Sequence, residues 1–212
     1  MPTYGDLKSL IATDLTRSNL TSYIAQAILD AIDDHSGERF WFNETTDYTF
    51  TTTPAVDTYT LASQAPIYEY IKMDRVKTQI GNTWYDIDYL DWNTLDRMFM
   101  SPTSGQPMRW TYRGTNQFRI YPTPPASTGA FPIKIFGHYR LMPLVNDSDS
   151  NDWTNRARNL IRYTALKRLY TYPVRDEGQQ QKADMAGAIE LNYLRRETTR
   201  RLRRGYMVAY YG

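Results

Sequence analysis

The stretch SNLTSYIAQAILDAIDDHSGERFWFN, residues 18–43, contains the point where helical spacing of apolar residues gives way to strand-like alternation. Its apolar side chains first recur at i, i+3, i+4 and i+7, which predicts an amphipathic helix over about 20–35 that ends at Gly37. Three adjacent aromatic residues follow, and the middle one, Trp41, must point away from the other two if the segment is extended. This change of period places a helix before a β-rich region.

A second amphipathic helix is predicted at the N-terminal end of the sequence. Thr3 and Asp6 have nearly the spacing of a capping box, and apolar residues follow them at helical intervals. The helix is expected to cover about 4–15. Each of these two helices has an apolar face and therefore needs a packing partner.

The middle of the chain alternates apolar and polar residues over several short segments, which predicts strands. Gly81-Asn82 and Gly114-Thr115-Asn116 have the composition of hairpin loops. A short helix is expected over about 91–99. The expected strands cover about 48–52, 59–61, 68–77, 84–88, 108–112, 118–121 and 132–139. The first two are expected to pair with each other.

Two further helices are predicted at the C-terminal end. One begins at Trp153 and ends before Pro173, and the other runs over about 176–204 and ends at Gly205. The last helix has a narrow apolar stripe, and its final turns are rich in arginine. The stripe consists of Met185, Ile189 and Tyr193.

These patterns predict an α+β fold in which N- and C-terminal helices form a helical bundle with a β-rich insertion between them. The expected parts are a bundle body of residues 1–38 and 150–175, a β-rich insertion with hairpins over 39–149, and an extended C-terminal helical arm over 176–212.

Composition excludes several classes of protein. Hydrophobic residues make up 41% and charged residues 23%, which is typical of a globular chain and not of a disordered one. There is no cysteine and there are only two histidines, so disulfide frameworks, thiolate sites and multi-histidine metal centres are not expected, and neither is a cofactor. No apolar run approaches the roughly 20 residues that span a bilayer, and no targeting segment is recognisable, so we expect a protein that is made and folded in a cytoplasm without a membrane anchor. The 18 tyrosines and five tryptophans are typical of chains with extensive interfaces.

Charge is distributed unevenly along the chain. Residues 1–150 carry 12 basic and 17 acidic side chains, whereas residues 151–212 carry 13 basic and 6 acidic ones. An acidic body with a basic, mainly arginine-containing end predicts a partner, or a neighbouring copy, that is met by that end.

No segment of the sequence has a recognisable catalytic pattern. Asp147, Asp149 and Asn151 imitate the start of a calcium loop, but its glycine and its final glutamate are replaced, so we interpret the segment as a polar loop that caps a helix. Three aspartates at 86, 88 and 91 are close in sequence and are interpreted as solvated or capping residues, although paired carboxylates also occur in glycosidases. His35 is interpreted as a helix-end residue, and His138 has no nucleophile at a recognisable spacing.

The order of several short aromatic motifs resembles the head-to-tail adaptor, or head-completion, proteins of short-tailed bacteriophages. The motifs follow two N-terminal helices and precede a two-helix C-terminal region. They are Arg39-Phe-Trp-Phe-Asn43, Thr51-Thr-Thr53, Tyr59-Thr-Leu61, Gln106-Pro107, Phe118-Arg-Ile-Tyr-Pro122, Tyr139-Arg-Leu141 and the helix start at Trp153.

The resemblance implies a structural virion protein without catalytic residues. Members of this family form a ring of twelve copies below the portal protein, close the DNA-filled head and seat the tail tube or nozzle. The expected partners are therefore the portal protein, the tail tube or nozzle protein, further copies of the chain, and the packaged DNA that passes through the channel. The expected location is the head–tail junction of the virion.

Two surfaces are predicted to carry this role. The first, a portal-binding surface, consists of Arg195, Arg196, Arg200, Arg201, Arg203, Arg204, Tyr206, Val208, Tyr210 and Tyr211. The second, for contact with the tail or with a neighbouring copy, consists of Trp84, Tyr112, Gly114, Thr115 and Asn116.

Two other functions remain open from the residues. A basic nucleic-acid-binding module is compatible with arginines beside aromatic residues. A peptidoglycan-degrading virion enzyme would use Asp86 or Asp88, and it is kept because some relatives in other short-tailed viruses are linked to cell-wall hydrolysis.

Overall fold

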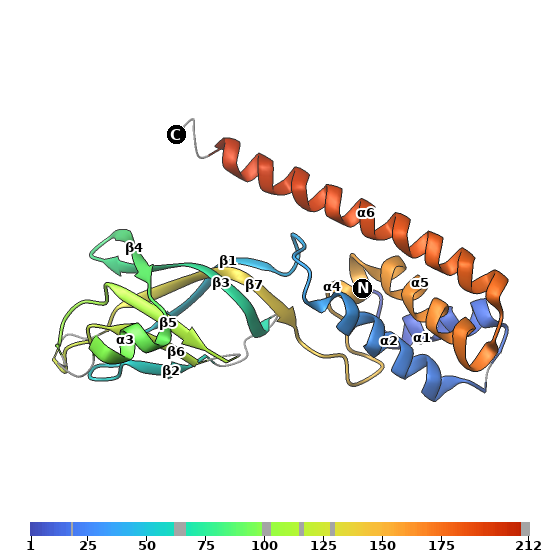
Figure 1. Cartoon of the computed structure of the whole chain (residues 1–212), viewed down its shortest axis with the longest axis horizontal. Helices are drawn as coiled ribbons and strands as arrows, with labels where there is room; N and C mark the ends of the chain where they lie inside the picture. The colour runs from blue at the N-terminus through green and yellow to red at the C-terminus, as the bar shows by residue number, and fades with distance from the viewer. Residues whose placement is uncertain (18, 62–66, 99–102, 115–116, 128–129, 209–212) are drawn as a thin grey trace. The chain divides into compact units, whose positions relative to one another are not determined.

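The computed structural model describes residues 1–212 except 18, 62–66, 99–102, 115–116, 128–129 and 209–212, and it describes only the backbone of residues 45–47 and 202–208 (Figure 1). The chain divides into two compact units, each described here by itself. The helical unit contains residues 1–43 and 141–212, and the sheet unit contains residues 44–140.

The helical unit is built around a central helix. Helix α5 packs against α1 and α2 on one side and against α6 on the other, so that α5 lies between α2 and α6 (Figure 1). Its core contains fully buried aliphatic residues from both ends of the sequence, among them Leu7, Ile28 and Ile161. The elements are α1 (Tyr4–Leu15), α2 (Thr21–Ser36), α4 (Asp152–Asn155), α5 (Arg158–Leu169), a π-helical turn η1 (Tyr170–Val174) and α6 (Glu177–Val208).

The N-terminus of α1 is held by its own cap and by a distant loop. The predicted capping box is present: the Asp6 amide donates to Thr3 Oγ1 at 3.2 Å and the Thr3 amide donates to Asp6 Oδ2 at 2.8 Å. The next free amides, of Tyr4 and Gly5, donate to carbonyl oxygens of the loop that precedes α4. This loop therefore satisfies donors that the first helical turn leaves unpaired.

The aromatic segment after α2 forms a turn that closes the helical unit. Phe40 and Phe42 are buried with their rings stacked 5.2 Å apart, and Trp153 meets both rings edge-on. Asn43 is buried: its side-chain nitrogen Nδ2 donates to the Glu38 carbonyl at 2.8 Å, and its side-chain oxygen accepts from the backbone amide of Phe40 at 2.8 Å. These bonds replace the backbone pairing that a strand would supply.

The sheet unit contains one seven-stranded mixed sheet in the order β1-β7-β3-β4-β5-β6-β2. Most pairs are antiparallel, but β4 and β5 run parallel through Asp88 and Tyr89 opposite Arg109 and Trp110. The short helix α3 (Trp92–Met98) connects these two strands. The strands are β1 (Glu44–Thr51), β2 (Thr58–Thr60), β3 (Ile67–Ile80), β4 (Thr83–Tyr89), β5 (Arg109–Arg113), β6 (Gln117–Tyr121) and β7 (Pro132–Leu141).

One glycine of β7 is required by the close approach of β3. A Cβ atom at Gly137 would lie 2.1 Å from the carbonyl oxygen of Lys72 and 3.0 Å from Cα of Met73. No side chain fits at that distance, so the two strands can be neighbours only with glycine at this position.

The expected fold class, an α+β chain with a helical bundle of N- and C-terminal helices and a β-rich insertion, is wrong. The strands form a single curled mixed sheet of seven strands, with helices at both ends of the chain, in place of an insertion of local hairpins. The physical reason is long-range pairing: β1 pairs with β7 and β2 with β6, although β1 and β2 were expected to pair with each other. Local alternation specifies strands but not the partners that close a sheet.

Most individual elements were predicted correctly. The helices α1, α2 and α3 and the β3–β4 and β5–β6 hairpins lie where the sequence patterns place them. The helix expected from Trp153 is divided into α4 and α5, and α6 continues through Gly205 to Val208.

Candidate partner-binding surfaces

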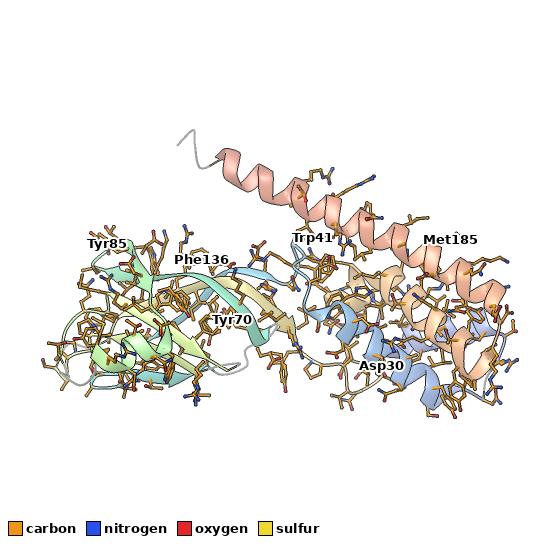
Figure 2. All side chains as sticks on the ribbon, in the orientation of Figure 1. Asp30, Trp41, Tyr70, Tyr85, Phe136 and Met185 are labelled. Carbon is orange, nitrogen blue, oxygen red and sulfur yellow. The ribbon has the colours of Figure 1, made fainter. Side chains whose placement is uncertain are left out.

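Helix α6 has an inner and an outer face. The inner face packs against α5 and includes Ala183 and Leu194, which are 6% and 1% exposed. The outer face carries Met185, Ile189 and Tyr193, which are 62%, 69% and 59% exposed. Figure 2 shows Met185 on the side of α6 that faces away from α5. The apolar stripe noted in the sequence is thus not what holds α6 to its own unit.

The arginines of α6 are partly neutralised within the helical unit. Arg195 pairs with Glu38, and Arg200 and Arg201 each donate to Glu197 at 2.7 Å. Hydrogen bonds from Arg200 and Arg201 hold the pKa of the Glu197 carboxyl below its ordinary value. The repulsion among arginines is therefore offset by carboxylates of the same chain.

The other predicted portal-binding residues divide into three groups. Arg196 is exposed and makes no ion pair with any side chain that the structure describes. Only the backbone is described for Arg203, Arg204, Tyr206 and Val208. Tyr210 and Tyr211 lie outside the described residues.

Trp41 connects the aromatic turn to α6, a role that the sequence analysis did not assign. The guanidinium carbon of Arg201 lies 4.6 Å from the centroid of the Trp41 ring, and the Trp41 amide donates to Thr198 Oγ1 at 3.3 Å. Figure 2 shows Trp41 on the side of α6 that faces the rest of the helical unit. The sequence did indicate that Trp41 has a contact outside the core formed by Phe40 and Phe42, because three adjacent aromatic residues cannot all enter one core.

The predicted tail-contact residues lie on the β3–β4 and β5–β6 hairpins. Trp84 and Tyr112 were expected to be exposed, but both are half-buried. The Tyr112 ring stacks on Trp110 with centroids 6.0 Å apart, and burial raises the pKa of its hydroxyl. Gly114 has a φ of 61°, as a tight hairpin turn requires, and Thr115 and Asn116 lie outside the described residues.

The apolar side chains that are exposed on this unit are different ones. Tyr85, Tyr89 and Met108 are 49%, 53% and 60% exposed. Tyr85 and Tyr89 alternate with buried Ile87 on the same face of β4, and Figure 2 shows Tyr85 on the β3–β4 hairpin. The sequence analysis selected Trp84 and Tyr112 for the contact surface and did not select these three residues.

The sheet unit also has a face on which cations lie over aromatic rings. Lys134 Nζ is 5.9 Å from the Trp84 centroid and 5.8 Å from that of Phe136, and the Arg75 guanidinium is 4.4 Å from Phe136. Asp86 lies between Arg75 and Lys77 at 3.6 and 4.0 Å and partly neutralises this face. Such contacts stabilise the sheet and also present positive charge to solvent.

The carboxylates that a hydrolase would use are engaged in structural contacts. Asp86 pairs with Arg75, Asp88 pairs with Arg109, and Asp91 accepts from the Thr94 amide at 3.0 Å at the start of α3. Hydrogen bonds at Thr94 lower the pKa of Asp91. A catalytic acid would need a raised pKa, and the pKa of Asp91 is shifted in the opposite direction.

The polar loop before α4 acts as a cap, as predicted. Asn151 is the N-cap of α4, and its side-chain oxygen accepts from the Trp153 amide at 2.9 Å. Asp149 accepts from the amides of Val145 and Asn146, and these hydrogen bonds lower its pKa. Asp147 pairs with Lys8 of α1.

Two kinds of site are absent from the part of the chain that the structure describes. Among these residues, no group of three or more histidine, cysteine, aspartate or glutamate side chains is arranged to hold a metal ion. Over the same residues, no helix combines the length and the apolar character needed to cross a membrane.

Comparison with known proteins identifies the family. No curated protein matches the chain. A family model described as the SU10 adaptor protein matches residues 2–208, which is nearly the whole sequence. The match extends over both units, the aromatic turn and the described part of α6. It confirms the resemblance to phage head–tail adaptors and suggests that role and a place in the virion. The chain belongs to the SU10 adaptor protein family.

Proposed function

We propose that this chain is a structural, non-catalytic adaptor that joins the portal vertex of a phage head to the tail. Copies of the chain, twelve by the resemblance stated above, form a ring that closes the head after DNA packaging and lets DNA pass on infection. The single observation that carries this proposal is the family match over residues 2–208.

The portal-docking element in this proposal is the C-terminal end of α6. The contact of Arg201 with Trp41 holds the helix to its unit as far as Arg201, and the sequence beyond contains Arg203 and Arg204. Arginine forks pair with carboxylates in a fixed geometry, which would set the register on an acidic portal surface. The tyrosines at the end of the sequence would add apolar area.

The tail-facing element in this proposal is the pair of hairpins of the sheet unit. Hairpin tips can contact a partner without disturbing the core, and the β3–β4 hairpin carries the exposed Tyr85. The aromatic residues near the β5–β6 tip, such as Tyr112, would pack beneath the contacting residues of the hairpin and hold them in place. Deleting residues 114–116 should block tail attachment and leave portal docking intact.

The portal assignment is tested by two variants of equal charge. The first variant combines Arg203→Ser with Arg204→Ser. The control combines Arg17→Ser with Arg97→Ser, which removes the same charge from two exposed arginines elsewhere in the chain. Capture by the portal protein of the same virus is measured for each. The first should lose capture and the control should keep it.

A truncation separates this role from nucleic-acid binding. A chain that ends at Arg201 keeps the Trp41 and Glu197 contacts and should fold, but it should not bind portal rings. Unchanged portal binding by this chain would contradict the docking assignment. A strongly salt-dependent DNA affinity that the truncation removes, with portal assembly untouched, would favour the nucleic-acid-binding module.

A further inference from the structure

The outer face of α6 is apolar and basic over about four turns and contains no carboxylate. Helical spacing places six residues between 182 and 196 on this face. All of them are exposed, and neither Lys182 nor Arg196 makes an ion pair with any side chain that the structure describes. The acidic residues of the same turns, Asp184 and Glu190, are directed elsewhere around the helix. The six residues, named here the α6 stripe, are Lys182, Met185, Ile189, Asn192, Tyr193 and Arg196.

The opposite side of the helical unit has a pocket whose aromatic walls and nearby carboxylates are complementary to the apolar and basic residues of the α6 stripe. The pocket measures about 350 Å³, and two exposed tyrosines wall it: Tyr23 of α2 and Tyr172 of η1, whose rings meet edge-on at 6.1 Å. Ala27 and Leu169 line it further, and so do Asp30 and its ion-pair partner Arg168. We name this surface the tyrosine pocket.

The surroundings of the tyrosine pocket are acidic. Helix α2 contains three aspartates and neither lysine nor arginine. Asp30 and Asp34 share Arg168 at 3.7 and 2.6 Å, so one cation serves two carboxylates. Asp33 is exposed on the same helix. A surface with excess negative charge is thus complementary to the basic edges of the α6 stripe.

One copy of the chain cannot bring these two surfaces together. Helix α5 lies between α2 and α6, so the α6 stripe and the tyrosine pocket face away from each other on the same unit (Figure 1). Figure 2 shows Met185 on the outer side of α6 and Asp30 on α2, beyond α5. Two different, complementary surfaces on opposite sides of a subunit are the requirement for head-to-tail association, which closes into a ring when the rotation permits.

We propose that the α6 stripe of one copy binds in the tyrosine pocket of the next copy. Met185, Ile189 and Tyr193 lie against Tyr23 and Tyr172 of the neighbour and remove apolar surface from water on both sides. Lys182 and Arg196 face the aspartates of the neighbour's α2 and fix the direction of the helix. The inference rests on the proposed ring adaptor, and it assigns the surfaces that join its copies.

The absence of cysteine from the sequence makes a direct cross-linking test available. Gln26→Cys at the rim of the pocket and Ile189→Cys on the stripe are introduced together into the full-length chain. The chain is oxidised free in solution and, in parallel, in virus particles that carry the variant. A head-to-tail contact should give a ladder of dimers, trimers and larger species on a non-reducing gel, because each copy then contributes to two bonds.

Two single variants serve as controls for this test. Ile189→Cys alone, or Gln26→Cys alone, can give dimers only. A ladder from the double variant supports the contact when both single variants stay monomeric, because dimers of a single variant would show that like positions cross-link with each other. The proposed contact is overturned if the double variant gives only dimers, or no cross-link, both in solution and in particles. If the ladder is absent and Ile189→Asp also loses portal capture, the contact is overturned and the portal is identified as the partner that binds the α6 stripe.

Charge exchange distinguishes this contact from the proposed function itself. Reversing the stripe with Lys182→Glu and Arg196→Glu should reduce the oligomeric fraction by mass photometry at least tenfold. Adding Asp30→Lys and Asp33→Lys to the same chain should restore much of it, because the two changed surfaces are again complementary. If neither change alters self-association while portal capture persists, the contact is wrong and the adaptor role stands. If self-association responds as expected while the portal is not captured, the adaptor role is wrong and the contact stands.

Discussion

The guanidinium of Arg201 lies over the indole ring of Trp41, with its central carbon 4.6 Å from the ring centroid. The contact joins the aromatic turn after α2 to the C-terminal part of α6, which is far away in the sequence. Arg201 is held in place by Glu197, so the ring, the guanidinium and the carboxylate form one chain of contacts. Trp41 therefore ties the C-terminal part of α6 to the aromatic turn, in addition to the packing of α6 on α5.

Replacing this tryptophan should loosen the end of α6 without unfolding the chain. Trp41→Leu removes a cation–π contact worth roughly 1 kcal/mol, which corresponds to about fivefold faster amide exchange where local opening controls the rate. Hydrogen exchange over residues 195–201 is the measurement. Trp84→Leu, in the sheet unit, is the matched control and should leave this segment unchanged. Equal protection in wild type and Trp41→Leu would show that the contact does not hold the helix.

The glycine where β7 passes β3 should tolerate no side chain. Gly137→Ala would place a methyl group 2.1 Å from the Lys72 carbonyl oxygen, so the strands must separate. We expect a loss of about 3 kcal/mol or more in the free energy of unfolding, measured with denaturant. A Cβ atom at Gly37 meets nothing within 4 Å, so Gly37→Ala should change stability by about 0.5 kcal/mol at most. Similar stabilities for the two variants would contradict the close approach.

Two adjacent residues of α2 should respond very differently to a charge. Ile28 is 0% exposed, whereas Leu29 is 39% exposed. Ile28→Asp leaves a carboxylate in the core without a partner and should cost about 3–5 kcal/mol, which gives unfolded or insoluble protein. Leu29→Asp should remain folded. Thermal unfolding of both variants is the check, and a folded Ile28→Asp chain that only fails to assemble would show that this face of α2 is an interface instead of a core.

The helical unit should lose stability in mild acid through His35. Its Nε2 lies 3.2 Å from Thr164 Oγ1, and burial lowers its pKa below the ordinary value. As the pH falls through about 6.5, the unfolded chain takes up a proton that the folded chain resists, so the free energy of unfolding decreases. His35→Gln removes this titration.

The measurement for His35 is the change in Tm between about pH 7.5 and about pH 5.5. The wild type should lose more than His35→Gln over this interval. His138 is present in both proteins, so its contribution cancels in the difference. An equal decrease in Tm for the wild type and His35→Gln would show that His35 does not cause the loss of stability in acid.

The sequence predicted elements better than their partners. The capping box at Thr3 and the turn at Gly81 are local features, and both are present as expected. The parallel pairing at Tyr89 and Trp110 depends on residues about twenty positions apart and has no local indication. For the same reason the fold-class prediction was wrong, because it treated the strands as local hairpins of an insertion.

The candidate surfaces show the same limit. The apolar residues Met185, Ile189 and Tyr193 were recognised as a stripe from their spacing, but their spacing cannot state which side of the helix meets α5. The inner side is instead built from the smaller Ala183 and from Leu194. Glu197 was not singled out either: its arginine partners follow at i+3 and i+4 and can be read from the sequence, but its burial appears only when the helix is packed in its unit.

Electron microscopy of the chain mixed with portal rings from the same virus tests the central claim most directly. The account predicts an added ring of density on the tail side of each portal, with α6 directed at the portal. A chain that ends at Arg201 should give portal rings without this density. Portal rings that remain bare with the full-length chain in excess, while that chain binds DNA with strong salt dependence, would contradict the account.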